Sequence, residues 1–225
     1  YDTYLSYLKG EITREQLYSK IPDKILKSVI NLAIGEENNK IIQEDIDSLL
    51  GDRKVDFIIG GPPCQAYSLV GRARSKDKMK SDPRNYLFKE YAKYLEKYKP
   101  KLFVFENVLG LKSANGGKYL NEMKNLFSFK GYQIKLYTLE AKNFGVLQNR
   151  KRIIILGWQK NKPFSIPDLE RIKSNKEFMV DELLKDLPVI KAGEGTDRFV
   201  NYGVPTTEYL KTYSIRNGIE DRKSV

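Results

Sequence analysis

Residues 55–72 read V-D-F-I-I-G-G-P-P-C-Q-A-Y-S-L-V-G-R, and the predicted fold is built outward from this stretch. Val55 and residues 57–59 are β-branched or aromatic, which predicts a short buried strand. The strand ends at Gly60-Gly61-Pro62-Pro63, because glycine adopts unusual backbone angles and proline lacks an N–H. A loop that carries Cys64 therefore follows the strand directly.

Cys64 is the only cysteine in the chain. It follows the carboxyl end of a predicted strand, where open α/β sheets place ligands and chemistry. A lone cysteine can act as a nucleophile, but the usual histidine partner is missing because the chain has no histidine. A buried cysteine that only fills space is the alternative, and position alone does not separate the two.

Apolar runs over 102–105, 131–140 and 152–158 predict further strands. Apolar residues at helical spacing predict helices over 82–98, 116–129 and 176–187, and Asp82-Pro83 is a strong start signal for the first of them. Strands that alternate with helices at this spacing predict an α/β fold with a doubly wound, mostly parallel sheet.

The region before residue 55 shows no catalytic signature. Residues 1–34 predict two or three short helices, which Gly10 and Pro22 separate, with Gly35 as the cap of the last. Residues 41–47 are interpreted as a short strand that ends on acidic residues. Asp45 as the N-cap of a turn over 46–50 is the alternative.

The chain of 225 residues is basic, with a formal net charge of +11. Such a surface favours a polyanion, nucleic acid first and an anionic membrane second, although a lysine-rich composition alone is the alternative. No apolar run reaches the roughly 18 residues that a membrane span needs, and no leader is visible, so we expect a soluble, cytoplasmic protein. One cysteine and no histidine argue against a disulfide framework and a zinc site.

Three motifs carry a resemblance to a known family. Pro62-Pro63-Cys64-Gln65, followed by Ala66-Tyr67-Ser68 and Gly71-Arg72, resembles the Pro-Cys-Gln loop of the cytosine-C5 DNA methyltransferases. Phe105-Glu106-Asn107-Val108 is similar to the family's Glu-Asn-Val motif, and residues 143–152 are similar to its Gln-x-Arg-x-Arg motif. All three occur in the family's order, each beside a predicted strand. The chain thus resembles the bacterial members found in restriction–modification systems.

The resemblance implies the Rossmann-like fold of the S-adenosylmethionine-dependent methyltransferases and methyl transfer to carbon 5 of a cytosine flipped out of duplex DNA. Cys64 would add to carbon 6 of the base. Glu106 would offset charge at N3 and contact the exocyclic amine, and Arg152 would hold the carbonyl oxygen. Arg150 and Gln148 would brace the site. A structural ion pair is the alternative for Glu106.

Further positions follow from the resemblance. Asp45 and Ile46 match the family's Asp-Ile pair at the adenine of the cofactor. Pro62 and Leu87 are additional cofactor candidates, although a leucine at the start of this helix more often belongs to the core. Gln65, Ser68, Arg72 and Arg74 are the candidate DNA contacts. Five positive charges over residues 72–80 can neutralise phosphates, and an unengaged solvated loop is the alternative.

The resemblance is incomplete. The family's Gly-rich first motif is missing, and Gly-Pro-Pro-Cys stands where many members have Gly-Phe-Pro-Cys. The chain also starts at Tyr1 rather than Met, so we expect an excerpt. Residues 1–190 are assigned to part of the catalytic domain, and residues 191–225 to the approach to a target-recognition domain.

The expected partners are duplex DNA and S-adenosylmethionine, with no metal and no membrane. We expect a monomer that is encoded beside a cognate restriction endonuclease. Two alternatives remain: the branch of the family that methylates a transfer RNA cytosine, which also carries Pro-Pro-Cys-Gln, and a non-catalytic nucleic-acid-binding protein that retains the fold.

Overall fold

The computed structural model describes residues 2–63, 67, 82–174, 176–187, 189–193, 199–201, 207–212 and 221–223. The chain divides into two compact units. The first comprises Tyr1–Thr138 and Arg152–Phe164, and the second comprises Leu139–Lys151 and Ser165–Val225. The functional boundary expected near residue 190 stays a prediction.

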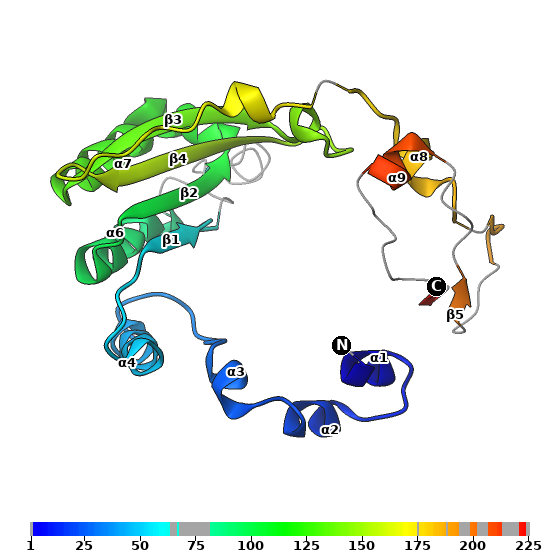
Figure 1. The fold of residues 1–225 in the computed structure, drawn as a ribbon. Coiled ribbons are helices and arrows are strands. Elements are labelled where there is room, and N and C mark those ends of the chain that lie inside the picture. Colours follow the sequence, from blue (N-terminus) through cyan, green and yellow to red (C-terminus); the bar gives the residue numbers. More distant parts are fainter. Residues whose placement is uncertain are drawn as a thin grey trace. The chain divides into compact units, whose positions relative to one another are not determined.

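A four-stranded sheet with the order β1-β2-β4-β3 lies at the centre of the first unit (Figure 1). Its strands are β1 (Phe57–Gly60), β2 (Leu102–Val108), β3 (Tyr132–Glu140) and β4 (Lys151–Gln159). β1 and β2 are parallel, and β2 and β4 are antiparallel. The backbone N–H of Ala141 donates to the carbonyl of Arg150, and that of Lys160 donates to the carbonyl of Gly131, both at 2.9 Å. These hydrogen bonds lie at the two ends of β3 and β4 and show that the strands form an antiparallel hairpin. Three of these four strands therefore share a direction, which agrees with the predicted α/β class and mostly parallel sheet.

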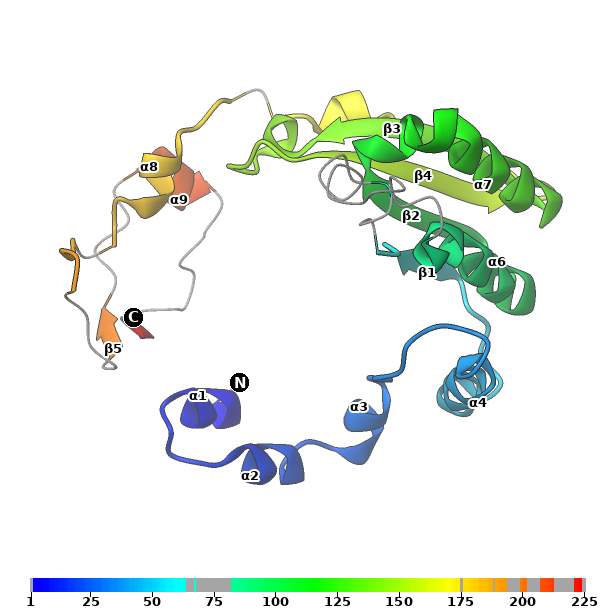
Figure 2. The same ribbon diagram turned by 180° about the vertical axis from the view of Figure 1, so that it is seen from behind.

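One face of the sheet is covered by α6 (Leu87–Tyr98) and α7 (Lys118–Phe129), which Figure 2 shows from behind. β2 alternates, so Phe103 and Phe105 point to this face and are fully buried. Tyr91 of α6 and Phe127 of α7 each contact both phenylalanines, with ring centroids 5.1 to 5.8 Å apart. The helices predicted over 82–98 and 116–129 are thus confirmed.

The opposite face of the sheet is covered only in part within the described residues. Trp158 of β4 is buried and packs on Phe164, with ring centroids 5.5 Å apart. On β1, by contrast, Phe57 is 45% and Ile59 is 71% exposed. The apolar run that predicted a buried strand is therefore buried on one face only.

Three short helices precede the sheet, as predicted: α1 (Asp2–Leu8), α2 (Arg14–Ser19) and α3 (Asp23–Lys27). The assignment of Gly35 as a helix cap is wrong. α3 ends at Lys27, because the backbone N–H of Ser28 already caps it by bonding to the carbonyls of Ile25 and Leu26.

The strand predicted over 41–47 is also wrong, because these residues lie inside α4 (Asn39–Leu50). Ile42, Ile46 and Leu49 recur at helical spacing, and Ile42 is buried. Polar contacts tie α4 to α6: Asn39 bonds Glu90 and Tyr94, the carbonyl of Gln43 accepts from Tyr98, and Asp47 pairs with Lys97. Asp45 is therefore neither at a strand end nor at an N-cap.

Short 3₁₀ turns complete the first unit. They are η1 (Pro83–Tyr86), η2 (Leu109–Lys112) and η3 (Ala114–Gly117). The predicted Asp82 cap is confirmed, because its carboxylate accepts the backbone N–H of Arg84 at 2.8 Å.

The second unit contains η4 (Ala141–Phe144), η5 (Leu169–Ile172), α8 (Val180–Leu184), α9 (Glu208–Thr212) and the antiparallel pair β5 (Phe199–Asn201) and β6 (Asp221–Lys223). The helix predicted over 176–187 is much shorter than expected. A residue before proline disfavours helical angles, and Pro188 follows this segment in the sequence. None of the helices in the described ranges is long and apolar enough to span a bilayer.

Gly157 of β4 lies opposite Phe103 of β2, and a Cβ built on it would overlap the buried ring of Phe103. We therefore expect Gly157→Ala to lower the free energy of unfolding by about 1–3 kcal/mol, as overpacking does. Urea denaturation measures this loss. A Cβ on Gly35 would meet nothing within 4 Å, so Gly35→Ala is the control, with an expected change within roughly 0.5 kcal/mol. Equal losses in both variants would contradict the packing account.

Candidate active site

The loop after β1 is anchored to β2 at its start. The side-chain amide of Asn107 donates to the carbonyl of Pro62 at 3.3 Å, and Asn107 is 1% exposed. The amide oxygen of Asn107 in turn accepts the backbone N–H of Val108 at 2.9 Å. The segment that leads into Cys64 is thus fastened to the neighbouring parallel strand. Cys64, Gln65, Ser68, Arg72 and Arg74 themselves lie outside the described residues.

Glu106 and Arg152 form an ion pair on neighbouring strands. The Nε atom of Arg152 lies 2.7 Å from Oε1 of Glu106. The antiparallel register places Arg152 opposite Val108, on the same face of the sheet as Glu106, so the two side chains are diagonal neighbours. Their side chains are 24% (Arg152) and 36% (Glu106) exposed, so a ligand can approach the pair from solvent.

The ion pair that was the alternative explanation for Glu106 therefore exists, but its partner is another predicted site residue. Two of the five predicted catalytic residues are thus brought together. β2 continues to Val108, so Glu106 lies within the strand. The expectation that Glu106 stands at the end of the strand is therefore wrong.

Gly61 leaves room for the carboxylate of Glu106. Gly60 pairs with Phe105 in the parallel register, so the next residues, Gly61 and Glu106, lie side by side. A Cβ on Gly61 would stand 3.0 Å from Oε2 of Glu106. One carboxylate oxygen is therefore bonded to Arg152, while the other faces the backbone at the start of the Cys64 loop.

Gln148 and Arg150 belong to the second unit and are both exposed. The backbone N–H of Gln148 bonds the carbonyl of Val146 at 2.7 Å, and that of Arg150 bonds the carbonyl of Gln148 at 2.9 Å. These bonds shape the tight loop that follows η4. Bracing of the base site by Gln148 and Arg150 stays a prediction.

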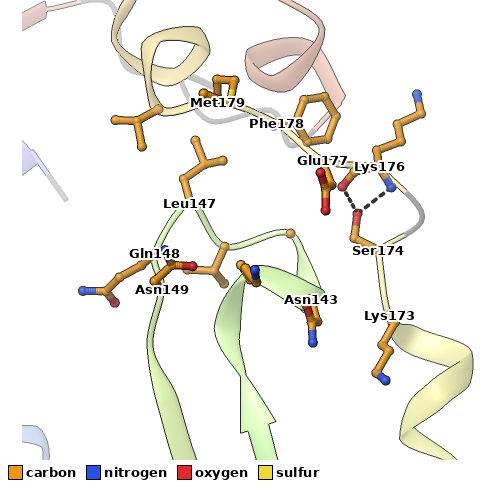
Figure 3. Close-up of a pocket in the computed structure, with 14 residues that line it drawn as sticks. Asn143, Leu147, Gln148, Asn149, Lys173, Ser174, Lys176, Glu177, Phe178 and Met179 are labelled. Atoms are coloured by element: carbon orange, nitrogen blue, oxygen red, sulfur yellow. Dashed lines mark hydrogen bonds between the residues drawn. The ribbon is translucent and has the colours of Figure 1, made fainter.

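A cavity of about 600 Å³ lies within the second unit, between this loop and residues 173–180 (Figure 3). Leu147 points across it towards Met179. Its lysines have acidic partners: Lys173 pairs with Glu170 at 2.6 Å, Lys142 with Glu140 at 3.7 Å, and Lys176 with Glu208. Because these charges are balanced locally, the cavity has no marked preference for an anion.

The four cofactor candidates do not come together. Pro62 lies just past the carboxyl end of β1, and Leu87 opens α6, whose Tyr91 sits beside Gly60 at the same edge. Asp45 is exposed on α4. Asp47 of the same helix pairs with Lys97, at the end of α6 opposite to Leu87. The described residues therefore bring Pro62 and Leu87 to the same end of the strands but do not gather all four candidates in one place. Within the described ranges, no group of three or more His, Cys, Asp or Glu side chains is placed to hold a metal ion.

Sequence reasoning gave no role to three residues that the structure places beside the site: Gly61, Tyr67 and Asn107. All three lie inside the motifs. Asn107 and Tyr67 bond backbone carbonyls, Tyr67 also packs on a helix, and Gly61 lies beside Glu106. The only signal in the sequence was their adjacency to Cys64 and Glu106.

Comparison with known proteins supports the motifs. The model of the C-5 cytosine-specific DNA methylase family matches residues 18–219. Type II methyltransferase M.Bpa9945I of Bacillus paralicheniformis is 40% identical over 216 residues, 87% of this chain and 48% of that protein. Type II methyltransferase M1.HphI of Haemophilus parahaemolyticus is 35% identical over 71% of this chain and 44% of that protein.

The fold is also similar to a solved E. coli structure, described as a DNA modification methyltransferase encoded within a prophage. The TM-score is 0.62 at 25% identity, over 81% of this chain and 50% of that one. The chain spans about half the length of these relatives. Because the family model matches most of the chain, the resemblance inferred from the three motifs is confirmed: the chain belongs to the C-5 cytosine-specific DNA methylase family.

Proposed function

We propose that this chain carries the base-binding and nucleophilic groups of a DNA (cytosine-5)-methyltransferase, which transfers a methyl group from S-adenosylmethionine to a cytosine flipped out of duplex DNA. The observation that carries the proposal is the Glu106–Arg152 pair, 2.7 Å apart and beside Gly61 at the start of the Cys64 loop. The carboxylate and the guanidinium lie on the two central strands, beside the loop that carries the nucleophile of the family's motif. Together they supply the acceptor and the donors that recognition of a cytosine ring requires.

Carbon 5 of cytosine is a weak nucleophile, and the thiolate of Cys64 overcomes this by adding to carbon 6. The electrons of the carbon 5–carbon 6 double bond then become available at carbon 5, while negative charge develops towards N3. S-adenosylmethionine, when bound, supplies the electrophilic methyl group. Transfer of the carbon 5 proton to water from the solvent then expels the thiolate and restores the double bond, while the proton shared with N3 returns to Glu106.

Glu106 and Arg152 divide the recognition of the ring between them. Glu106 offsets the charge at N3 by sharing a proton with that atom, and it accepts from the exocyclic amine, which distinguishes cytosine from thymine. A guanidinium has five N–H donors, so Arg152 can bond Glu106 and the carbonyl oxygen of the base together. In this arrangement the ion pair orients both groups before the base arrives.

The family's description as a DNA methylase and the net charge of +11 support DNA as the substrate. We propose duplex DNA, with Gln65, Ser68, Arg72 and Arg74 as its contacts. A bacterial restriction–modification setting in the cytoplasm, with a monomeric enzyme and a cognate endonuclease, is part of the same proposal. Pro62 and Leu87 remain the proposed cofactor contacts, while Asp45 and Ile46 stay predictions from the resemblance, because α4 carries them towards the other end of α6.

Covalent trapping tests the reaction. We expect the full-length protein, incubated with S-adenosylmethionine and duplexes that contain 5-fluorocytosine, to form an adduct that survives denaturation and maps to Cys64 by mass spectrometry. Fluorine at carbon 5 blocks the elimination that releases the enzyme. Cys64→Ala is the control and should form no adduct while still binding DNA. An adduct on transfer RNA alone would move the substrate to RNA, and none on either would favour a binding protein.

Glu106→Gln should lower turnover on duplexes with unmodified cytosine by about 10²-fold or more, because a glutamine amide can donate a hydrogen bond to N3 but cannot transfer a proton to it. Affinity for S-adenosylmethionine, measured by calorimetry, should change little. A large loss of cofactor affinity with turnover retained would place Glu106 in a different role.

Gly61→Ala separates activity from stability. The added Cβ would stand 3.0 Å from Oε2 of Glu106, so the carboxylate must move by a few tenths of an ångström. We expect turnover to fall by about tenfold or more, as misplacement of a catalytic group does. The urea midpoint should shift little, because the end of a flexible side chain can move aside. Unchanged turnover would show that the position of Oε2 is not critical.

A further inference from the structure

Tyr67 is the third residue after Cys64 and is 1% exposed. Its ring packs on Tyr119 of α7, with centroids 5.7 Å apart. Its hydroxyl donates a hydrogen bond to the backbone carbonyl of Asn85 in η1. Tyr67 is therefore fixed by two separate elements, one through its ring and one through its hydroxyl.

The segment between Pro62 and Tyr67 is held at both ends. Upstream, the carbonyl of Pro62 accepts from Asn107 at 3.3 Å. Downstream, Tyr67 is buried in the same core cluster that contains Phe105. Pro62 and Tyr67 are close in the sequence, so the stretch that carries Cys64 has an anchored residue on each side.

We propose that the Tyr67 hydroxyl is a positioning group, which sets the downstream end of the segment that carries Cys64 by bonding to the carbonyl of Asn85. This inference rests on the proposed function of Cys64. Tyr67 touches neither base nor cofactor in this account and acts only through the backbone that leads to the nucleophile. A phenylalanine would fill the same space in the core, so the role belongs to the oxygen atom alone.

The hydrogen bond from the Tyr67 hydroxyl should not depend on pH. Burial raises the pKa of Tyr67 above its ordinary value, so the group remains a donor wherever the enzyme works. The contribution of the hydrogen bond should therefore not vary between about pH 6 and 9.

Tyr132 provides a matched control. It is 2% exposed, belongs to the same core cluster, and donates its hydroxyl to the backbone carbonyl of Pro100 at 2.9 Å. Tyr132 is the first residue of β3, and Pro100 lies just before β2. Both are at the amino ends of these strands, whereas the Cys64 loop follows the carboxyl end of β1. Tyr67→Phe and Tyr132→Phe thus remove the same kind of bond, and only the first touches the proposed segment.

The experiment compares both variants with the wild-type full-length protein in the rate of adduct formation on 5-fluorocytosine duplexes, at saturating DNA and S-adenosylmethionine. Tyr67→Phe is expected to slow the adduct by roughly three- to tenfold, the effect of one hydrogen bond. The dissociation constant for DNA should not change, and the slowing should be the same across the pH range. Tyr132→Phe should react at the wild-type rate.

Thermal unfolding of each variant confirms that the rates are measured on folded protein. Equal rates for Tyr67→Phe and Tyr132→Phe, with a normal wild-type adduct, would overturn the positioning role and leave the proposed function intact. A slower rate explained by weaker DNA binding would also overturn it. No adduct from the wild-type protein would overturn the proposed function and this inference with it.

Discussion

The site depends on the aromatic layer that joins β2 to its two helices. Phe103 and Phe105 are fully buried between Tyr91 and Phe127, with centroid distances of 5.1 to 5.8 Å. Aromatic pairs of this geometry contribute about 0.5–1.5 kcal/mol each beyond the area they bury. They fix β2 in rotation as well as in position, since its alternate side chains cannot exchange faces without exposing two phenylalanines.

The pleat of β2 explains why two adjacent residues have different tasks. Asn107 shares the buried face with the phenylalanines and reaches the carbonyl of Pro62. Glu106 points to the other face, where the reversed strand β4 brings Arg152 alongside. One strand thus anchors the loop with one side chain and presents a carboxylate with the next.

The sequence was most informative where short motifs coincide with buried strands. It predicted the four strands of the sheet, α6, α7 and the Asp82 cap, because apolar periodicity is strong there. It failed at residues 41–47, where acidic residues were interpreted as the end of a strand. Contacts of Asn39, Gln43 and Asp47 with α6 support a helix there. The Glu106–Arg152 contact could not be read from the chain, because it depends on which strands are neighbours and on their register.

The order of pairing has a consequence for the assembly of the protein. β3 and β4 are joined by a short loop and meet locally, whereas Phe57 of β1 pairs with the distant Leu102 of β2. Contacts between residues far apart in the sequence form late, since closing a long loop costs chain entropy before the contact is gained. The pairing of β2 with β4 is also distant in the sequence, since Leu102 pairs with Trp158. We therefore expect the hairpin to form early and both pairings of β2 to form late. A molecule arrested before β2 pairs would have most of its helices and its hairpin, but neither the anchored loop nor the Glu106–Arg152 pair.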